Sequence, residues 1–193
     1  MKNQLLKIFI FMLIGYPVLS QDQGKSQIEV SYGMISNEEL GYDIINKVLD
    51  LFFPEDREVI KRTGCIFVTY KYFAFERLAF GATTGFNKYS RTDYFRNGNY
   101  TSLENKIVTV SGEVNFYYVK RRNISLYSLA GIGLFHRNTE TKQAYQQQSQ
   151  GETNGVALQF TPIGIRYGKS FGGFAEFGAG YKGVINLGVN VKF

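Results

Sequence analysis

Apolar and polar residues alternate along most of this chain after residue 20, with the period of a β-strand rather than of a helix. The clearest run is 107–119, where valine and aromatic residues at even positions oppose mainly polar residues at odd positions. Eight runs have about the length that a tilted strand needs to cross a membrane. They are residues 28–35, 65–75, 78–86, 107–119, 124–137, 156–167, 174–181 and 184–193.

The connections between these runs differ in length in a regular way. The tight turns are residues 75–77, 120–123 and 168–173, the long polar connections are 36–64, 87–105 and 138–154, and a short link is 182–183. Outer membrane barrels have short periplasmic turns and longer external loops. We therefore predict an all-β fold, an eight-stranded antiparallel transmembrane β-barrel, with both chain ends on the periplasmic side.

The run 156–167 changes its facing in the middle. Gln159 and Thr161 share one parity, whereas Arg166 has the other, and Pro162 lies between them. A β-bulge at Pro162 explains this change, because proline cannot donate to a ladder and an extra residue resets the facing. A misplaced strand end explains it equally well.

The first long connection contains the one helix that the sequence predicts, in the first external loop. Ser36 and Glu39 have the spacing of a capping box, and apolar residues then recur at helical spacing until Pro54. Two interpretations stay open: the helix covers the barrel mouth or lies on the membrane surface, or it binds a partner. The apolar stripe consists of Leu40, Ile44, Ile45, Val48, Leu49 and Phe52.

The first twenty residues have the order of a secretory signal peptide. Lys2 and Lys7 give the segment a positive start, and an apolar run follows at 8–14. Residues 18–20 then offer a cleavage site that ends in a small residue. A retained anchor is the alternative, but the apolar run is far shorter than the roughly 20 residues of a spanning helix. We expect residues 1–20 to be the signal peptide and residues 21–193 to form one barrel domain.

The alternation alone does not distinguish a water-soluble barrel from a membrane barrel. The signal peptide, the unequal connections and the aromatic residues near strand ends favour a barrel whose apolar face meets lipid. We expect the cations inside to pair with some of the glutamates, because an isolated buried ion costs several kcal/mol. Eight strands enclose just enough space for side chains, so we predict a filled lumen without an open pore. The predicted lumen charge network is Glu29, Lys71, Glu113, Arg166 and Glu176.

Four segments carry a family resemblance: Ser20-Gln21, GCIFVTYKY at 64–72, TPIGIRY at 161–167 and GVNVKF at 188–193. They resemble the outer membrane β-barrel proteins of Bacteroidota, a porin-like family. The resemblance implies a location in the bacterial outer membrane. It also implies that Phe193 is the C-terminal assembly signal, recognised by the barrel-assembly machinery during biogenesis.

Few residues offer catalytic or ligand chemistry. Residues 178–183 have the spacing of a dinucleotide fingerprint, but a strand follows where a helix must hold the phosphates. His136 lies at the external end of its strand, where barrels that modify lipid A place a histidine; Arg137 and Asn138 follow where a deacylase would have serine. One histidine, Cys65 and scattered carboxylates do not form a metal site. We predict no catalytic, cofactor or metal site.

The formal net charge of +6 falls to +4 without the two signal-peptide lysines, and the charges are scattered, so nucleic-acid binding is not favoured. Lys88, Arg91 and Arg96 in the second long connection could contact lipopolysaccharide phosphates. We predict a non-enzymatic protein surrounded by outer membrane lipids, whose loops serve envelope integrity or surface interaction with lipopolysaccharide or a host surface. The alternatives are a lipid A- or phospholipid-modifying enzyme, and a narrow transporter or receptor for a small hydrophobic ligand.

Overall fold

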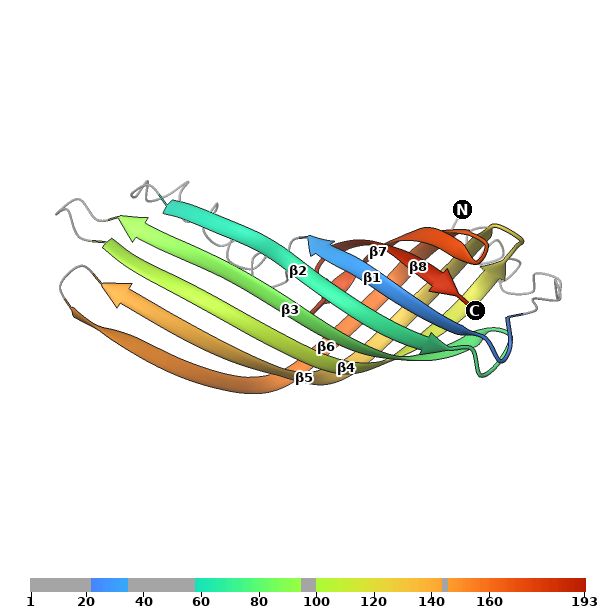
Figure 1. The fold of residues 1–193 in the computed structure, drawn as a ribbon, viewed down its shortest axis with the longest axis horizontal. Coiled ribbons are helices and arrows are strands. Elements are labelled where there is room, and N and C mark those ends of the chain that lie inside the picture. The colour runs from blue at the N-terminus through green and yellow to red at the C-terminus, as the bar shows by residue number, and fades with distance from the viewer. Residues whose placement is uncertain (1–21, 35–57, 95–99, 144–145) are drawn as a thin grey trace, which may run out of the picture.

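Eight antiparallel strands form a closed barrel in the computed structural model, which describes residues 22–34, 58–94, 100–143 and 146–193. Each strand pairs with its neighbours in the chain, and the last pairs with the first (Figure 1). The strands are β1 (Ser26–Met34), β2 (Glu58–Tyr72), β3 (Leu78–Tyr94), β4 (Tyr100–Lys120), β5 (Ile124–Gln143), β6 (Gln146–Gly168), β7 (Phe171–Gly180) and β8 (Ile185–Lys192). The predicted eight-stranded architecture is confirmed.

The pairing of β1 with β8 closes the barrel. Its register runs from Gln27↔Lys192 to Met34↔Ile185, and the backbones of Ser26 and Phe193 exchange hydrogen bonds of 2.8 and 2.9 Å. Closure leaves no unpaired strand edge at this level, which is what a sheet in hydrocarbon requires.

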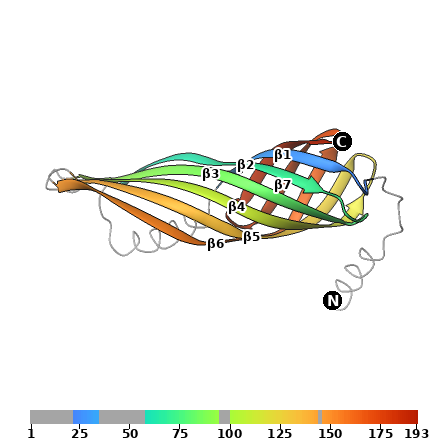
Figure 2. The same cartoon turned by 60° about the horizontal axis from the view of Figure 1, so that its bottom comes forward.

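The strands fall into two length classes. β1, β7 and β8 have 9, 10 and 8 residues, whereas β2 to β6 have 15 to 23. Figures 1 and 2 show the five longer strands continuing past the ends of the three shorter ones. We call this continuation the extended sheet. It comprises residues 58–64, 88–94, 100–106, 138–143 and 146–152.

The two ends of the barrel differ. The turn end carries the tight connections after β2, β4 and β6 together with residues 22 and 193, and the loop end carries the extended sheet. The sequence placed residues 87–105 and 138–154 in long loops, and this was wrong for most of them, because pairing continues to Tyr94↔Tyr100 and to Gln143↔Gln146. Both faces are polar there, so the ladder continues without the alternation that would reveal it.

Two predicted elements lie outside the described residues: the signal peptide at 1–20 and the helix after Ser36. Nowhere in the four described ranges is there a helix long and apolar enough to span a membrane. Within them the chain is strand and turn alone.

The bulge predicted at Pro162 is confirmed. The register of β6 with β7 shifts between Phe160 and Ile163, and its register with β5 shifts between Tyr127 and Leu129. The extra residue turns the following side chains over, so Arg166 points inward although its parity differs from that of Gln159.

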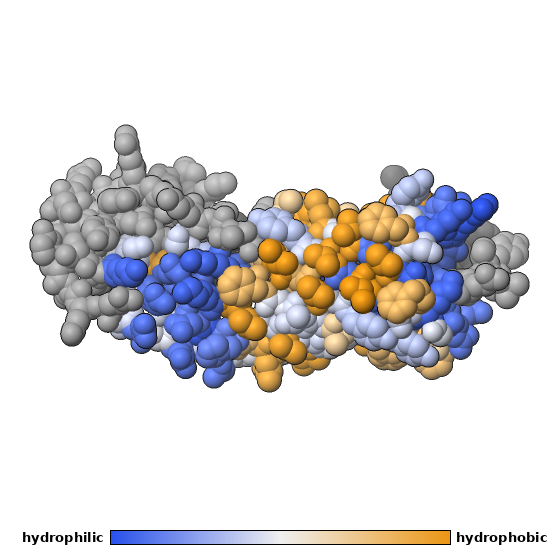
Figure 3. Space-filling view, in the orientation of Figure 1, coloured by the Kyte–Doolittle hydropathy of each residue, from blue (hydrophilic) through white to orange (hydrophobic). Residues whose placement is uncertain are grey.

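Side chains divide sharply between the two faces of the barrel wall. On β1 the even positions from Ile28 to Met34 are 40 to 47% exposed, whereas Gln27, Glu29 and Ser31 are at most 5% exposed. Figure 3 shows the outward apolar side chains as a band across the middle of the molecule, with polar regions on both sides. We call this band the apolar belt. It includes Val30, Val68, Phe80, Val110, Val114, Ile132, Leu134, Val156, Leu158, Phe160, Ile163, Phe177, Leu187 and Val189.

Candidate functional site

The interior of the barrel holds all five charged residues that the sequence placed there. Glu29, Lys71, Glu113, Arg166 and Glu176 are each at most 3% exposed. The register puts Gly81 between Lys71 and Glu113, and a Cβ on Gly81 would lie 3.1 Å from Cγ of Lys71. This missing side chain leaves room for the long charged ones in a narrow barrel.

The first ion pair joins two neighbouring strands. Nζ of Lys71 on β2 lies 2.8 Å from Oε2 of Glu29 on β1, and both side chains are buried. Gln27 donates from Nε2 to Oε1 of Glu29 at 2.6 Å. Both carboxylate oxygens of Glu29 therefore have a partner, as a charge removed from water requires.

The second ion pair uses a residue that the sequence analysis missed. Nζ of Lys182 lies 2.7 Å from Oε1 and 2.9 Å from Oε2 of Glu113, with both side chains fully buried. Oε1 of Glu113 also accepts hydrogen bonds from the hydroxyls of Thr83 at 2.6 Å and Tyr181 at 2.7 Å. Glu113 is thus the most heavily coordinated carboxylate of the described interior.

Lys182 reaches this position because the β7–β8 connection folds into the barrel mouth. Gly180 and Gly183 have φ values of +139° and +84°, which favour glycine, and N of Gly183 donates to O of Gly180 at 3.0 Å. N of Lys182 donates to Oε1 of Gln159 at 2.9 Å. The segment that spells a dinucleotide fingerprint is therefore a strand end and an inward turn that plugs the barrel.

The third glutamate completes one polar layer. Glu176 accepts hydrogen bonds from the Tyr127 hydroxyl at 2.9 Å and from Nδ2 of Asn186 at 2.7 Å, and Nζ of Lys182 lies 4.0 Å from its Oε2. We call the set Glu29, Lys71, Glu113, Glu176 and Lys182 the charged layer. All five side chains are at most 3% exposed.

The expected pairing of Arg166 with a glutamate was wrong. Its guanidinium donates to Oδ1 of Asn190 at 2.7 Å and to the carbonyl oxygens of Gly168 and Lys169 at 2.8 and 2.6 Å. Arg166 lies close to the turn end, where the carbonyls of the β6–β7 turn point away from any ladder. A fork of N–H donors satisfies several such oxygens at once.

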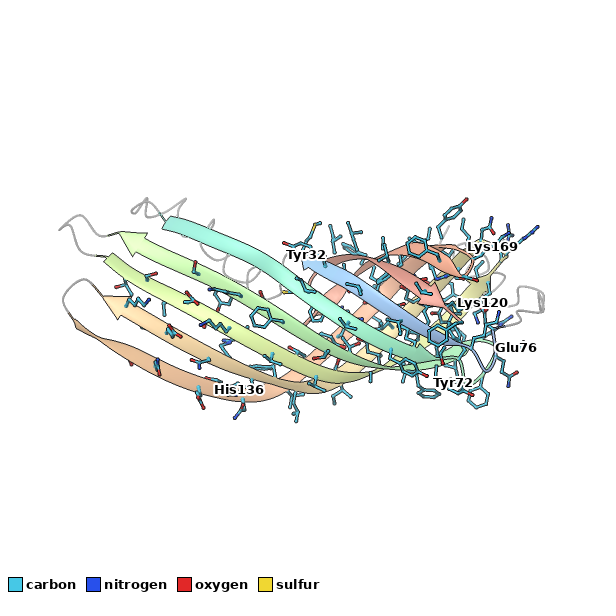
Figure 4. All side chains as sticks on the ribbon, viewed as in Figure 1. Tyr32, Tyr72, Glu76, Lys120, His136 and Lys169 are labelled. Atoms are coloured by element: carbon cyan, nitrogen blue, oxygen red, sulfur yellow. The ribbon has the colours of Figure 1, made fainter. Side chains whose placement is uncertain are left out.

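Aromatic rings fill the lumen between the charged layer and the turn end. The Tyr117 ring packs at a tilt between Phe73, at 5.4 Å between ring centroids, and Tyr127, at 5.0 Å. Nζ of Lys120 lies 4.5 Å and that of Lys192 4.7 Å from the centroid of the Phe73 ring. These cation–π contacts hold both lysines over the turn-end opening, where Figure 4 labels Lys120.

Asp22 ties the two lysines together just before β1. Its Oδ2 accepts a 2.7 Å hydrogen bond from Lys192 and lies 3.5 Å from Nζ of Lys120, and its Oδ1 lies 3.5 Å from Nζ of Lys25. Burial raises the pKa of the Asp22 carboxyl, but the bond from Lys192 and the three lysine charges outweigh it and hold the pKa below its ordinary value.

His136 lies on the outer wall, not in the lumen. Its Nδ1 is 2.7 Å from Oδ1 of Asn154, its partner on β6, and the contact is exposed to solvent (Figure 4). Ser128 lies eight positions away on the same strand, which at about 3.4 Å per residue separates the two by roughly 27 Å. These two residues therefore do not form a nucleophile and base.

No group of three or more histidine, cysteine, aspartate or glutamate side chains gathers closely enough to hold a metal ion in the described parts of the chain.

Phe193 lies at the turn end with 63% of its surface exposed. Its role in assembly stays a prediction.

No family model matches this chain, and no curated protein sequence matches it. Among solved structures it is similar to the N-terminal β-barrel domain of Pseudomonas aeruginosa OprF, with 13% identity over 90% of this chain and 100% of that one and a TM-score of 0.46. It is also similar to Ail, the attachment invasion locus protein of Yersinia pestis, with 14% identity, coverage of 89% and 99% and a TM-score of 0.48. Both are small outer membrane barrels.

A third similar structure is the transport unit of the autotransporter AIDA-I from Escherichia coli. The identity is 8%, the match covers 91% of this chain and 58% of that one, and the TM-score is 0.44. None of the three TM-scores reaches 0.5.

Proposed function

We propose that this chain is a non-enzymatic integral protein of the bacterial outer membrane. Its filled barrel is an anchor, and its extended sheet serves surface interaction or envelope integrity. The observation that carries the proposal is the division of the barrel wall into an outward apolar belt and an inward charged layer. In water this arrangement would expose a continuous apolar band, whereas in a bilayer it is the stable one.

The orientation follows from the two ends. Tight turns are typical of the periplasmic side and long connections of the external side, so the turn end faces the periplasm and the extended sheet stands outside the cell. The resemblance to Bacteroidota barrels adds the barrel-assembly machinery as a partner during biogenesis. Its recognition element is the exposed ring of Phe193.

The extended sheet offers a polar surface just beyond the apolar belt. Lys88 and Lys106 are register partners on β3 and β4, next to the belt pair Phe86↔Val108. Glu104 lies 2.8 Å from Lys88 and 3.3 Å from Lys106. Lysines at this height are placed to meet lipopolysaccharide phosphates. The sequence analysis named Lys88, Arg91 and Arg96 as candidate phosphate contacts. Among these three, the structure describes the side chain of Lys88.

Membrane fractionation combined with gel migration tests the anchor. We expect the protein in the outer membrane fraction, and we expect the folded barrel to migrate differently before and after boiling. Recovery in the soluble periplasm without a migration shift would contradict the proposal. Large, steady single-channel openings from the pure protein would contradict the filled lumen.

Shortening the β5–β6 hairpin tests the surface role. Arg137 and Thr153 are register partners, so replacing residues 138–152 by Asn-Gly gives a hairpin with a two-residue turn. We expect the shortened protein to keep its migration shift but to behave like a gene deletion in lipopolysaccharide binding and in resistance to bile salts. Full complementation by the shortened protein would contradict the role given to the extended sheet.

A further inference from the structure

A cavity of about 170 Å³ lies at the loop end of the lumen, on the far side of Tyr181 from the charged layer. Two rows of inward residues line it. The lower row follows the register Phe67↔Gly85↔Thr109↔Phe135, and the upper row follows Asn87↔Ile107↔Arg137. The cavity is therefore set at the level where the closed barrel gives way to the extended sheet.

Two glycines create the space. A Cβ on Gly85 would lie 2.1 Å from the Phe67 ring, and a Cβ on Gly155 would lie 2.6 Å from the Phe135 ring. Each ring can lie flat over the neighbouring strand only because that strand carries no side chain there. The rings lean in opposite directions, Phe67 toward β3 and Phe135 toward β6, and the space between them stays open.

The cavity has an apolar bottom and a polar rim. Tyr181 forms the floor with its ring 6.0 Å from that of Phe67, and its hydroxyl is already engaged by Ser111 and Glu113 at 2.7 Å each. The floor therefore presents carbon to a ligand. Arg137 brings a cation to the rim, with its guanidinium 5.5 Å from the Phe135 ring centroid.

The cavity opens beside the apolar belt. The last pair between β6 and β7 is Gln159↔Gly180, and N of Tyr181 donates to O of Leu158 at 3.1 Å. Beyond this point no described strand pairs with that edge of β6. Val156 and Leu158, which lie along the same edge, are both 61% exposed as part of the belt. Both residues also line the cavity, so the apolar belt reaches its edge.

We propose that this cavity binds a medium-chain fatty acid, with the end of its acyl chain between Phe67 and Phe135 and its carboxylate at Arg137. An apolar cavity of about 150 Å³ holds a benzene molecule, so this one holds roughly six carbons. Drug-sized ligands need about 300 Å³ or more. A charge-assisted bond to a guanidinium selects the carboxylate. The proposal goes beyond the anchoring role and makes the barrel mouth a receptor site.

The test uses the full mature chain in phosphatidylcholine nanodiscs, with ¹³C-labelled isoleucine and alanine methyl groups observed by NMR. Octanoate is the probe ligand, and 1-octanol, which has the same number of carbons but no charge, is its control. We expect saturable shifts of the Ile107 and Ala157 methyls with both probes. The Ile132 methyl, which lies in the apolar belt, reports partition into the lipid and should shift without saturating.

Variants distinguish the part of the cavity that holds the acyl chain from the part that holds the carboxylate. Ala157→Leu fills the cavity and should abolish the saturable Ile107 shift with both probes. Ile107→Phe, observed at the Ala157 methyl, serves the same purpose if that variant does not fold. Arg137→Gln should weaken octanoate binding about tenfold and leave octanol binding unchanged, because it removes one charge-assisted bond. Lys142→Gln removes an exposed cation from the extended sheet and should change neither.

Three results would overturn the proposal: no saturable shift in the wild type, equal octanoate binding by wild type and Arg137→Gln, or equal binding by the filled-cavity variant. Nuclear Overhauser contacts from the Ile107 methyl to residues 36–54 would also overturn it, because the chain itself would then occupy the cavity. A normal migration shift in the same samples shows that the barrel is folded, so the anchoring role can hold even if the fatty-acid site is refuted.

Discussion

Strand β5 passes through two environments, and its side chains change while its backbone pairing does not. From Ile124 to Leu134 the outward positions are mainly apolar and alternate with inward positions as different as Ser125, Leu129 and Gly131, whereas from Asn138 onward both faces are polar. Its register with β4 continues past this change to Thr101↔Gln143. Hydrogen bonding between neighbouring strands fixes the ladder, and the surrounding solvent selects the side chains.

The two regions also contain the same chemical pair in different settings. Lys182 and Glu113 meet at 2.7 Å with both side chains fully buried. Lys106 and Glu140 meet at 3.3 Å on the extended sheet, with 42% and 23% of their side chains exposed. A buried pair is costly to break because its remaining partner stays desolvated, whereas water replaces the partner of an exposed one.

Glu113→Gln should have the largest effect. It leaves Lys182 buried next to a neutral amide, and we expect a loss of about 3 to 5 kcal/mol in the free energy of unfolding. Urea unfolding in lipid, followed by the migration shift, measures it. The double variant Glu113→Leu with Lys182→Met should recover much of the loss, and a Glu113→Gln protein as stable as wild type would contradict the charged layer.

Leu158→Arg should rank second. This side chain is 61% exposed in the apolar belt, and an arginine facing lipid costs up to about 4 kcal/mol, with a cost that falls toward the interface. Glu152→Arg, six positions along β6 on the same face, is the matched control. It lies in the extended sheet, so we expect its unfolding midpoint to stay at the wild-type value. Equal losses from both changes would refute the boundary between belt and extended sheet.

Asp22→Asn should have a smaller effect with a defined pH dependence. It removes a charge-assisted bond to Lys192, partly screened by water, and we expect about 1 kcal/mol. Because folding lowers the Asp22 pKa, the contribution is complete above the ordinary pKa of 3.8 and is lost as the pH falls through the lowered value. Wild type and variant should differ at pH 6 and converge under strong acid; a gap that persists there would rule out the charge.

Glu140→Gln should have the smallest effect of all. It breaks the contact with Lys106, which is exposed and keeps Glu104 within 3.3 Å. We expect no measurable change in the urea midpoint. A loss comparable to that of Glu113→Gln would show that the extended sheet is far less hydrated than its exposure indicates.

The sequence predicted the barrel because the wall has an apolar outward face and a buried inward face, which imposes a period of two on the strands. It underestimated β2 to β6 because water imposes no such period, so residues 88–94 and 138–143 lacked an apolar face to detect. The bulge at Pro162 was visible because proline and a change of parity coincide there.

The candidate site was predicted only in part. Glu29, Lys71, Glu113 and Glu176 could be identified because alternate residues of a strand share one face. Lys182 lies in a connection between strands, where this alternation does not apply. Two signals pointed to it: three predicted glutamates faced two cations, and glycines at 180 and 183 permit an inward turn. Arg166 had the correct face, but its distance from the charged layer along the barrel axis depends on strand tilt, which periodicity does not give.

The bond between Lys182 and Glu113 joins residues 69 positions apart, one from the middle of the chain and one from its last hairpin. Until that hairpin arrives, Glu113 has no lysine and the barrel has no seam between β8 and β1. Ion pairing of Glu113 and closure of the wall are therefore completed together, late, and over a long sequence separation, which slows folding. The hairpin brings Glu176 together with Lys182, so it leaves the formal charge of the charged layer unchanged. A barrel that lacks the hairpin is unsealed, and its Glu113 has lost the lysine with which it forms an ion pair.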